Sequence, residues 1–227
     1  LVGSEMCIRD SNSMASISNK IIVLCCCFVS TTLAWGQNGK HFVFPEYQEG
    51  QIVYKNKKVN KVELNYNKAT EEMIYTGSDG KKMALHPIDQ IDTIYFEKRS
   101  FIPSGNSFEE VLLSGKYPLY ASYRCRLSIG AQNIGYGSSS TTAIDNISSL
   151  NTGGEMYQLK LPENYKVEPY TIYTIEINGK RERFRRIKEV IKIFPERKKE
   201  IMSFQKKNKL KNDNEGIIQV IQYISSL

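Results

Sequence analysis

Between Glu49 and Leu127 the chain consists of short segments in which apolar and polar residues alternate, separated by polar or glycine-containing turns. Alternation with a period of two is typical of β-strands that bury one side. Strands are predicted at residues 50–55, 61–66, 72–77, 81–85, 92–98, 108–115 and 117–127. Asp79-Gly80 is the strongest hairpin signal between them, because both residue types tolerate positive φ. This spacing predicts an antiparallel sheet or a small barrel-like sandwich.

The second predicted strand illustrates the alternation. Val62, Leu64 and Tyr66 share one face of it. Glu63 and Asn65 point to the other face. The pattern predicts a half-solvated strand with Asn65 on the water side.

After residue 154, strand-like patterning resumes at residues 155–161 and 170–177, and Asn178-Gly179 predicts a two-residue hairpin turn. The period then becomes helical. Three amphipathic helices are predicted: residues 187–194, ended by Pro195; residues 196 to about 208; and a third from about residue 212. The residues predicted to be buried are Ile187, Val190, Ile191 and Phe194, then Ile201, Met202 and Phe204, then Ile217, Ile218, Val220, Ile221 and Ile224. Asn212 and Glu215 have the spacing of a capping box at the start of the third helix.

The segment between these two regions has a different composition. Residues 128–154 are rich in Gly, Ser, Thr and Asn and contain neither Lys nor Arg. A stretch of this length and composition predicts a flexible loop or linker. The predicted class is therefore α+β: an antiparallel β-rich domain (37–127), a flexible Gly/Ser/Thr loop (128–154), and a β-hairpin followed by three short basic helices (155–227).

The N-terminal residues predict export. Residues 1–11 resemble the translation of a sequencing-library adapter, so residues 1–13 are set aside and Met14 is taken as the native start. Residues 14–36 then have the short polar start, apolar core and small terminal residues of a secretory signal peptide, with cleavage expected before Gln37. A lipoprotein signal is the alternative, because Cys25, Cys26 and Cys27 lie in this segment.

Removing these residues leaves one of the chain's five cysteines, Cys125. An intramolecular disulfide and a thiolate metal site are thereby excluded from residues 37–227. Cys125 alternates with Tyr123 and Leu127 in a strand-like run, which predicts a buried, unreactive thiol.

Positive charge is concentrated at the C-terminus: residues 178–227 hold 14 Lys and Arg against six Asp and Glu, whereas the whole chain has a net charge of +7. Such a surface is able to bind anionic partners. The candidate anion-binding residues are Arg181, Arg183, Arg185, Arg186, Lys198 and Lys199. The alternative is that these residues form the solvated faces of amphipathic helices.

Residues for catalysis are scarce. Only two histidines are present, His41 in a predicted mobile N-terminal stretch and His86 in a predicted turn. A triad of His86 with Asp89 or Asp92 and a loop serine lacks the Gly-x-Ser-x-Gly elbow that would hold its nucleophile. Adjacent glutamates, at residues 71–72 and 109–110, would face opposite sides of a strand. No catalytic, cofactor-binding or metal-binding residue is therefore expected, and the many tyrosines suggest either cross-strand packing or an exposed binding face.

Several blocks together resemble uncharacterised exported proteins of Bacteroidota. They include VELNYNKATEEMIY, IYFEKRSFIP, FEEVLLSGKYPLY, GYGSSSTTAIDNISS, EMYQLKLPENYKVEPYTIYTI and RIKEVIKIFPERKKEIMSFQKKNKL. The resemblance implies export and architecture, and it implies neither a reaction nor particular site residues.

Three functions follow from these observations. The first is a non-enzymatic binding or assembly protein in the periplasm, at the outer membrane or secreted, with an envelope protein or an anionic envelope component as partner. The second is a hydrolase with a site of dispersed polar residues near His86, and the third is an anion-binding module formed by the basic helices. Nucleic acid is not an expected partner, and no membrane span is expected after signal cleavage.

Overall fold

The structure is a computed structural model that describes residues 40–129, 132–134, 138–140, 143–144 and 165–227. The chain divides into residues 1–36 and a compact unit of residues 37–227, and only the second unit is described below. The predicted adapter segment (1–13), signal peptide (14–36) and strand at 155–161 lie outside the described residues. So does most of the predicted loop at 128–154.

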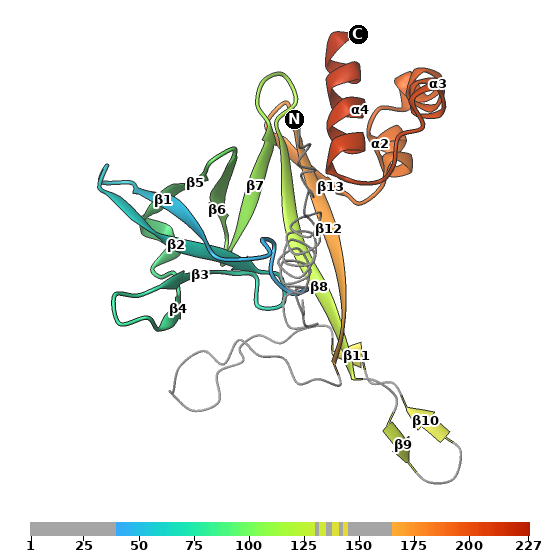
Figure 1. Cartoon of the computed structure of the whole chain (residues 1–227). Helices are drawn as coiled ribbons and strands as arrows, with labels where there is room; N and C mark the ends of the chain where they lie inside the picture. Colours follow the sequence, from blue (N-terminus) through green and yellow to red (C-terminus); the bar gives the residue numbers. More distant parts are fainter. Residues whose placement is uncertain (1–39, 130–131, 135–137, 141–142, 145–164) are drawn as a thin grey trace, which may run out of the picture. The chain divides into compact units, whose positions relative to one another are not determined.

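One large antiparallel sheet organises this unit (Figure 1). Its strands are β1 (Gln48–Tyr54), β2 (Val59–Asn67), β3 (Glu72–Thr76), β4 (Lys82–Ala84), β5 (Ile91–Phe96), β6 (Arg99–Ser104), β7 (Ser107–Leu113), β8 (Leu119–Ile129), β11 (Ala143–Ile144), β12 (Tyr165–Ile177) and β13 (Lys180–Phe184). The strand order is β13-β12-β8-β7-β6-β5-β1-β2-β3-β4, and β11 pairs with β8. A short 3-10 turn, Ile88–Gln90, leads into β5. A separate small pair is formed by β9 (Gln132–Ile134) and β10 (Ser138–Ser140).

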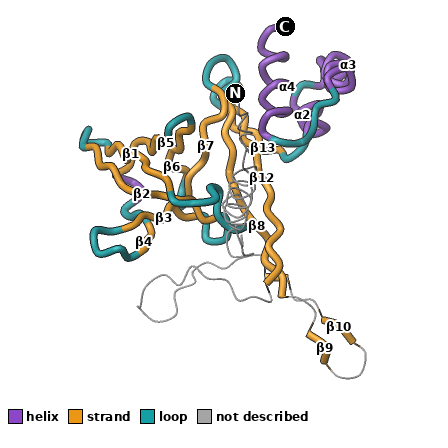
Figure 2. The backbone as a smooth tube through the Cα atoms, viewed as in Figure 1, coloured by secondary structure: helices purple, strands orange, loops and turns teal. Residues whose placement is uncertain are grey.

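The longest strands, β8 and β12, join the two predicted halves of the chain in this sheet. They pair without a register shift from Tyr165↔Ile129 to Ile175↔Leu119. Figure 2 shows this pair extending beyond the shorter strands β5 to β7. The pair therefore has a part within the sheet and a distal part that carries fewer neighbouring strands.

Three helices follow the sheet: α2 (Ile187–Ile193), α3 (Lys198–Asn208) and α4 (Asn214–Ser226), with a 3-10 turn at Pro195–Arg197. Ile187, Val190, Ile201 and most of the apolar stripe of α4 are buried against Leu119, Ala121, Tyr173, Ile175 and Phe184 of the sheet. Within the described residues, every helix is too short or too polar for a membrane crossing.

A second core lies among β1 to β7. Phe101 is fully buried there, with the rings of Phe44, Tyr66 and Phe96 at centroid distances of 6.3, 6.2 and 5.5 Å. The predicted exposure of Asn65 is wrong, because its side chain is 1% exposed. Its amide accepts hydrogen bonds from the N–H of Phe44 and Tyr66 and donates to the carbonyls of Phe44 and Glu46. On the polar side of β2, Asn65 therefore binds the preceding chain segment, whereas Lys61 and Glu63 remain exposed.

The predicted α+β class is confirmed, with an antiparallel sheet and three C-terminal helices. Strand β6 was not predicted, because only the two-residue turn Glu97-Lys98 separates it from β5 and because it contains Pro103. Met202 was predicted to be buried but is 52% exposed. In α3, Ile201 is fully buried and Phe204 packs partly buried against the same core, whereas Met202 points to solvent.

Turn and cap residues were predicted with mixed success. β12 and β13 are joined by Asn178-Gly179, which have φ of 52° and 76°, as the sequence predicted. The predicted capping box at Asn212 is wrong by one residue: Asp213 is the N-cap of α4 and accepts a hydrogen bond of 2.9 Å from the N–H of Gly216. The Asn212 side chain accepts instead from the N–H of Ile187, which begins α2, at 2.9 Å. The two caps fix the start of α4 beside the start of α2.

Candidate functional site

The distal part of β12 has an open outer edge. β13 pairs with β12 only from Ile177 back to Tyr173, and in the described part of the chain no strand pairs with that side of β12 from Tyr165 to Ile172. The N–H of Glu176 donates to the carbonyl of Pro118, the residue that precedes β8, so the backbone groups of Glu176 point toward β8. Backbone groups point alternately to the two sides of a strand. Those of Thr171, Pro169 and Val167, each an odd number of residues from Glu176, therefore point to the open edge.

Pro169 is consistent with this assignment. Proline has no N–H to donate, so within sheets it occupies edge positions where no ladder bond is lost. On the β8 side, the N–H of Cys125, opposite Pro169, points away from β12 and donates to the carbonyl of Lys68 at 3.1 Å. The open edge therefore offers the N–H and C=O groups of Val167 and Thr171 and the C=O of Pro169.

A groove of about 670 Å³ lies along this edge. We call it the edge groove; it is lined by Pro169, Tyr170, Thr171, Tyr173, Arg185, Arg186, Glu189, Asn212, Asp213, Asn214 and Glu215. Strand β12 forms one wall, and the starts of α2 and α4 form the other. An extended chain lying in the groove would run beside unpaired backbone groups.

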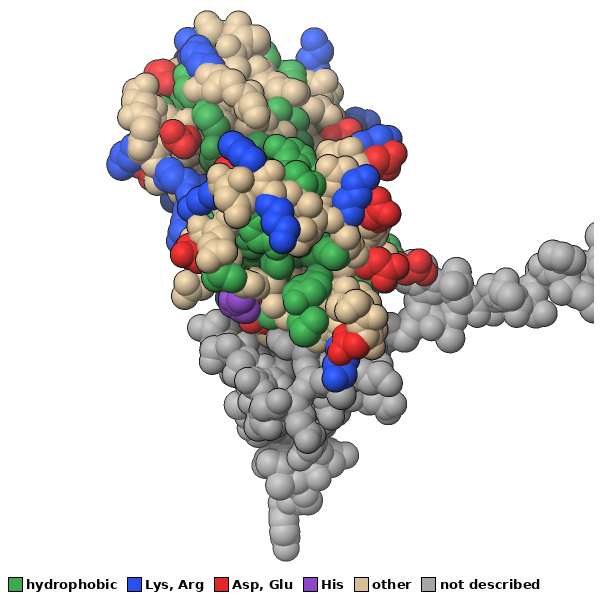
Figure 3. All heavy atoms as spheres, turned by 90° about the vertical axis from the view of Figure 1, so that its left-hand side faces the viewer, with side chains coloured by type: hydrophobic (Ala, Val, Ile, Leu, Met, Phe, Trp, Pro, Cys, Tyr) green, Lys and Arg blue, Asp and Glu red, His purple; other side chains and the backbone are tan. Residues whose placement is uncertain are grey.

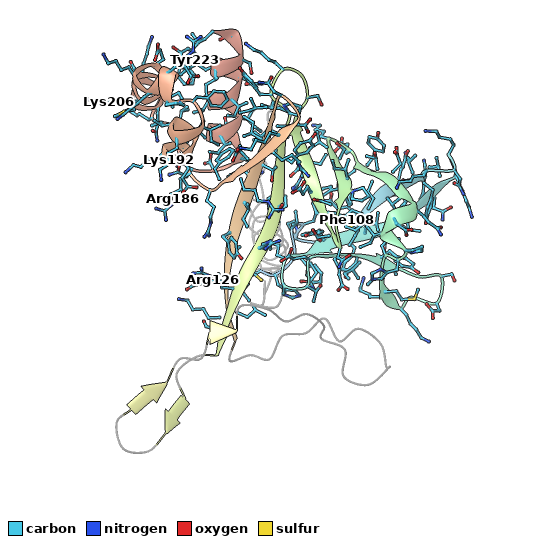
Figure 4. The ribbon with its side chains drawn as sticks, turned by 180° about the vertical axis from the view of Figure 1, so that it is seen from behind. Phe108, Arg126, Arg186, Lys192, Lys206 and Tyr223 are labelled. Carbon is cyan, nitrogen blue, oxygen red and sulfur yellow. The ribbon has the colours of Figure 1, made fainter. Side chains whose placement is uncertain are left out.

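Of the six predicted anion-binding residues, the structure brings Arg185 and Arg186 together at the edge groove. The guanidinium of Arg185 lies 4.4 Å from the centre of the Tyr170 ring, and that of Arg126 lies 5.8 Å from the same ring. Figure 4 shows Arg186 and Arg126 on the same side of the β8–β12 pair. Guanidinium groups therefore gather around the ring of Tyr170, and the acidic side chains Glu189, Asp213 and Glu215 also line the groove.

The other four predicted residues lie elsewhere. Arg181 pairs with Glu109 and lies over the ring of Tyr120. Arg183 lines a different groove, beside Lys180 and Lys192. Lys198 and Lys199 are exposed in the first turn of α3. On the side of the sheet formed by β1 to β5, basic and acidic side chains are intermixed (Figure 3).

A hydrogen-bonded network connects α4 to the sheet beneath the groove. The hydroxyl of Tyr173 donates to Asn214 Oδ1 at 2.9 Å, and Asn214 Nδ2 donates to the hydroxyl of Tyr123 at 2.5 Å. Tyr123 in turn donates to Glu110. Arg99 donates to both carboxylate oxygens of Glu110, at 2.6 and 2.7 Å. Since every donor in this series has an acceptor, the network holds the groove wall in one arrangement.

The two tyrosines of this network, Tyr123 and Tyr173, have raised pKa values because they are removed from water. Burial, and then the charge of Glu110, raises the pKa of Tyr123 well above its usual range. Burial, and then the charge of Asp213, raises the pKa of Tyr173 to about 12. Both hydroxyls are therefore neutral hydrogen-bond donors at neutral pH, and neither is suited to act as a phenolate nucleophile.

A second groove of about 440 Å³ adjoins the first and shares four lining residues with it. We call it the inner groove; it is lined by Val43, Lys68, Arg99, Tyr123, Pro169, Tyr170, Thr171 and Asn214. Lys68 is half-buried, and burial lowers the pKa of its ammonium. In the described residues its charge has no carboxylate within ion-pair distance.

Cys125 is buried, as predicted, and burial raises the pKa of its thiol to about 11. We expect iodoacetamide at pH 8 to alkylate Cys125 roughly 100-fold more slowly in the folded protein than in denaturant, because the thiolate is the reactive form. Peptide mass spectrometry at Cys125 measures both rates. Equal rates would contradict a buried, neutral thiol.

The remaining candidate catalytic residues do not assemble a site. His41, expected in a mobile stretch, is fully buried and packs against the Phe42 ring. His86 is exposed, and its Nε2 lies 3.9 Å from Glu72. Glu109 and Glu110 do face opposite sides of β7, toward Arg181 and Arg99 respectively. Among the described residues, no group of three or more His, Cys, Asp or Glu side chains has a metal-binding arrangement.

Sequence reasoning missed Lys68, Thr171 and the Arg99–Glu110 pair. Pro169 within a strand pattern was the available signal, because it marks an edge. The other residues gave no signal, since their meeting depends on strand order. Comparison of the chain with protein-family models, with curated proteins and with solved structures finds no match.

Proposed function

We propose that this protein is a non-enzymatic binding or assembly protein of the bacterial envelope, and that it holds an extended segment of a partner polypeptide along the open edge of β12. The observation that carries the proposal is the conjunction of unpaired backbone groups with a groove of about 670 Å³ beside them. Addition of a strand to an exposed sheet edge is a common mode of peptide recognition, in which main-chain hydrogen bonds supply affinity and flanking pockets supply specificity. The predicted signal peptide supports the compartment.

The groove is preformed, which favours binding. Asn214, Tyr173 and Tyr123 are joined by hydrogen bonds, and the Asn212 side chain ties the α3–α4 connection to the start of α2. A wall that is already ordered loses little conformational entropy when a ligand binds. The surroundings of His86 give the hydrolase alternative less support, since its imidazole is exposed and near a single carboxylate.

The proposal is tested by selecting binders from a displayed library of random linear peptides and measuring their affinity by fluorescence anisotropy. Thr171→Pro removes an N–H that points to the open edge, so the β8–β12 ladder should persist, as it does at Pro169. We expect this variant to bind the selected peptides roughly tenfold or more weakly, as expected for the loss of about one hydrogen bond and of strand geometry.

Ala84→Pro is the matched control. Leu85 donates to the carbonyl of Met73, so the N–H of Ala84 points away from β3, at the opposite edge of the sheet. This control should bind as tightly as the wild type. Hydrogen exchange should show protection of the Val167 and Thr171 amides in the complex. If no peptide family is selected, or if Thr171→Pro binds unchanged while folded, the proposal is wrong.

A further inference from the structure

The inner groove lies where one side chain of a bound segment would point. Thr171 is paired with Tyr123 and Pro169 with Cys125, so these side chains share one face of the sheet. Directly opposite residues on neighbouring strands project to the same face. A residue placed opposite Thr171 or Pro169 would therefore direct its side chain over the inner groove.

The two cations that line the inner groove, Arg99 and Lys68, differ in whether a carboxylate neutralises them. Arg99 is neutralised by its two hydrogen bonds to Glu110, and Glu110 also accepts from Tyr123. Lys68 has no corresponding partner among the described residues, although it is half-buried. A partly desolvated ammonium without an anion is costly, and it becomes favourable when a carboxylate pairs with it.

The backbone of Lys68 is held in place on both sides. Its N–H donates to the carbonyl of His41 at 2.7 Å, and its carbonyl accepts from Cys125 at 3.1 Å. The Lys68 side chain therefore starts from a fixed point beside β8. Two further cations, Arg185 and Arg126, lie around the ring of Tyr170, whose side chain points to the other face of the sheet from that of Thr171. The inner groove therefore presents the ammonium of Lys68, whereas in the edge groove Arg185 and Arg186 lie beside the acidic side chains Glu189, Asp213 and Glu215.

We propose that the inner groove is a subsite for an acidic side chain of the bound segment, whose carboxylate pairs with the ammonium of Lys68. This assignment rests on the proposed function, and it names the occupant as an extended peptide with Asp or Glu at one fixed position. Charge complementarity selects this occupant: the subsite has one uncompensated cation and offers hydroxyl and amide groups of Thr171 and Asn214 beside it.

The test is a double-mutant cycle on the full protein with a peptide selected on the wild type, synthesised with its acidic residue and with the corresponding amide. On the wild type, the change from Glu to Gln or from Asp to Asn should weaken binding roughly 10- to 100-fold, the range for a charge-assisted hydrogen bond. On Lys68→Met, the same change should weaken binding less than about twofold, because the paired cation is gone. Lys61→Met, at an exposed position of β2, should behave like the wild type.

Folding does not obscure the result. Lys68→Met replaces a half-buried ammonium by an apolar chain of similar length, so the thermal midpoint should be unchanged or raised. Lys68→Gln provides a second, polar variant for the same cycle. An unchanged preference for the acidic peptide in both variants would overturn the subsite, as would selected peptides without a fixed acidic position. In either case the binding lost in Thr171→Pro would still support the edge groove, whereas the absence of any selected peptide would remove both proposals.

Discussion

Replacing Glu110 by glutamine is expected to destabilise the folded protein by about 3–5 kcal/mol, the usual loss when one partner of a buried ion pair is removed. The Glu110 side chain is 6% exposed and accepts two hydrogen bonds from Arg99 and one from Tyr123. Glutamine leaves the guanidinium of Arg99 without a counter-charge. That guanidinium is also enclosed by the rings of Phe44 and Phe101, at 4.7 and 5.3 Å, so water is a poor substitute.

Urea unfolding measures this loss, and Glu97→Gln is the control. Glu97 is exposed in the turn between β5 and β6, so its replacement should change stability by less than about 0.5 kcal/mol. The double variant Arg99→Met with Glu110→Leu should recover part of the lost stability, because it removes both charges together but leaves the Tyr123 hydroxyl without its acceptor. A Glu110→Gln protein within about 1 kcal/mol of the wild type would show that the pair is solvated.

Phe101→Ala is expected to cost a similar amount, about 3–5 kcal/mol, through lost apolar burial and the cavity that it leaves. Phe101 is fully buried at the centre of the core formed by β1 to β7. The rings of Phe44, Tyr66 and Phe96 surround it, and the ordered strands cannot collapse into the vacated space.

The matched control for this prediction is Tyr95→Ala, on the adjacent strand β5. Tyr95 is 47% exposed, and its removal should cost less than about 1 kcal/mol. Unfolding is measured by fluorescence and by far-ultraviolet circular dichroism. We expect the two signals to change together, because both cores pack on one continuous sheet. A Phe101→Ala protein as stable as the control variant would show that this core is loosely packed.

Much of the local structure was predictable because it depends on neighbours in sequence. The period of two located β1 to β5, β7 and β8, and the helical period with Pro195 located α2 and α3. Asn178-Gly179 formed its turn because these residues adopt positive φ at little cost. The failures at Asn65 and Met202 have one cause, since periodicity reports which residues share a face and not what covers that face.

The candidate site was less predictable. Arg185 and Arg186 were named from charge alone, and so were Arg181 and Lys198, which lie elsewhere. The basic residues of this region are divided among one face of β13, the connection between β13 and α2, and the first turn of α3. Charge counts therefore indicated a basic region without locating a groove.

Residue order and local preference were thus enough to establish the α+β class, the helices, the tight turns and a buried Cys125. They act over a few residues, within one strand or one turn of helix. The open edge of β12 exists only because β13 is eight residues shorter than β12, so that its pairing stops at Tyr173. The meeting of Lys68, Thr171 and Asn214 likewise depends on strand order and on the packing of α4, which bring together residues distant in the chain. Long-range pairing, to which no local pattern corresponds, decided where the candidate site lies.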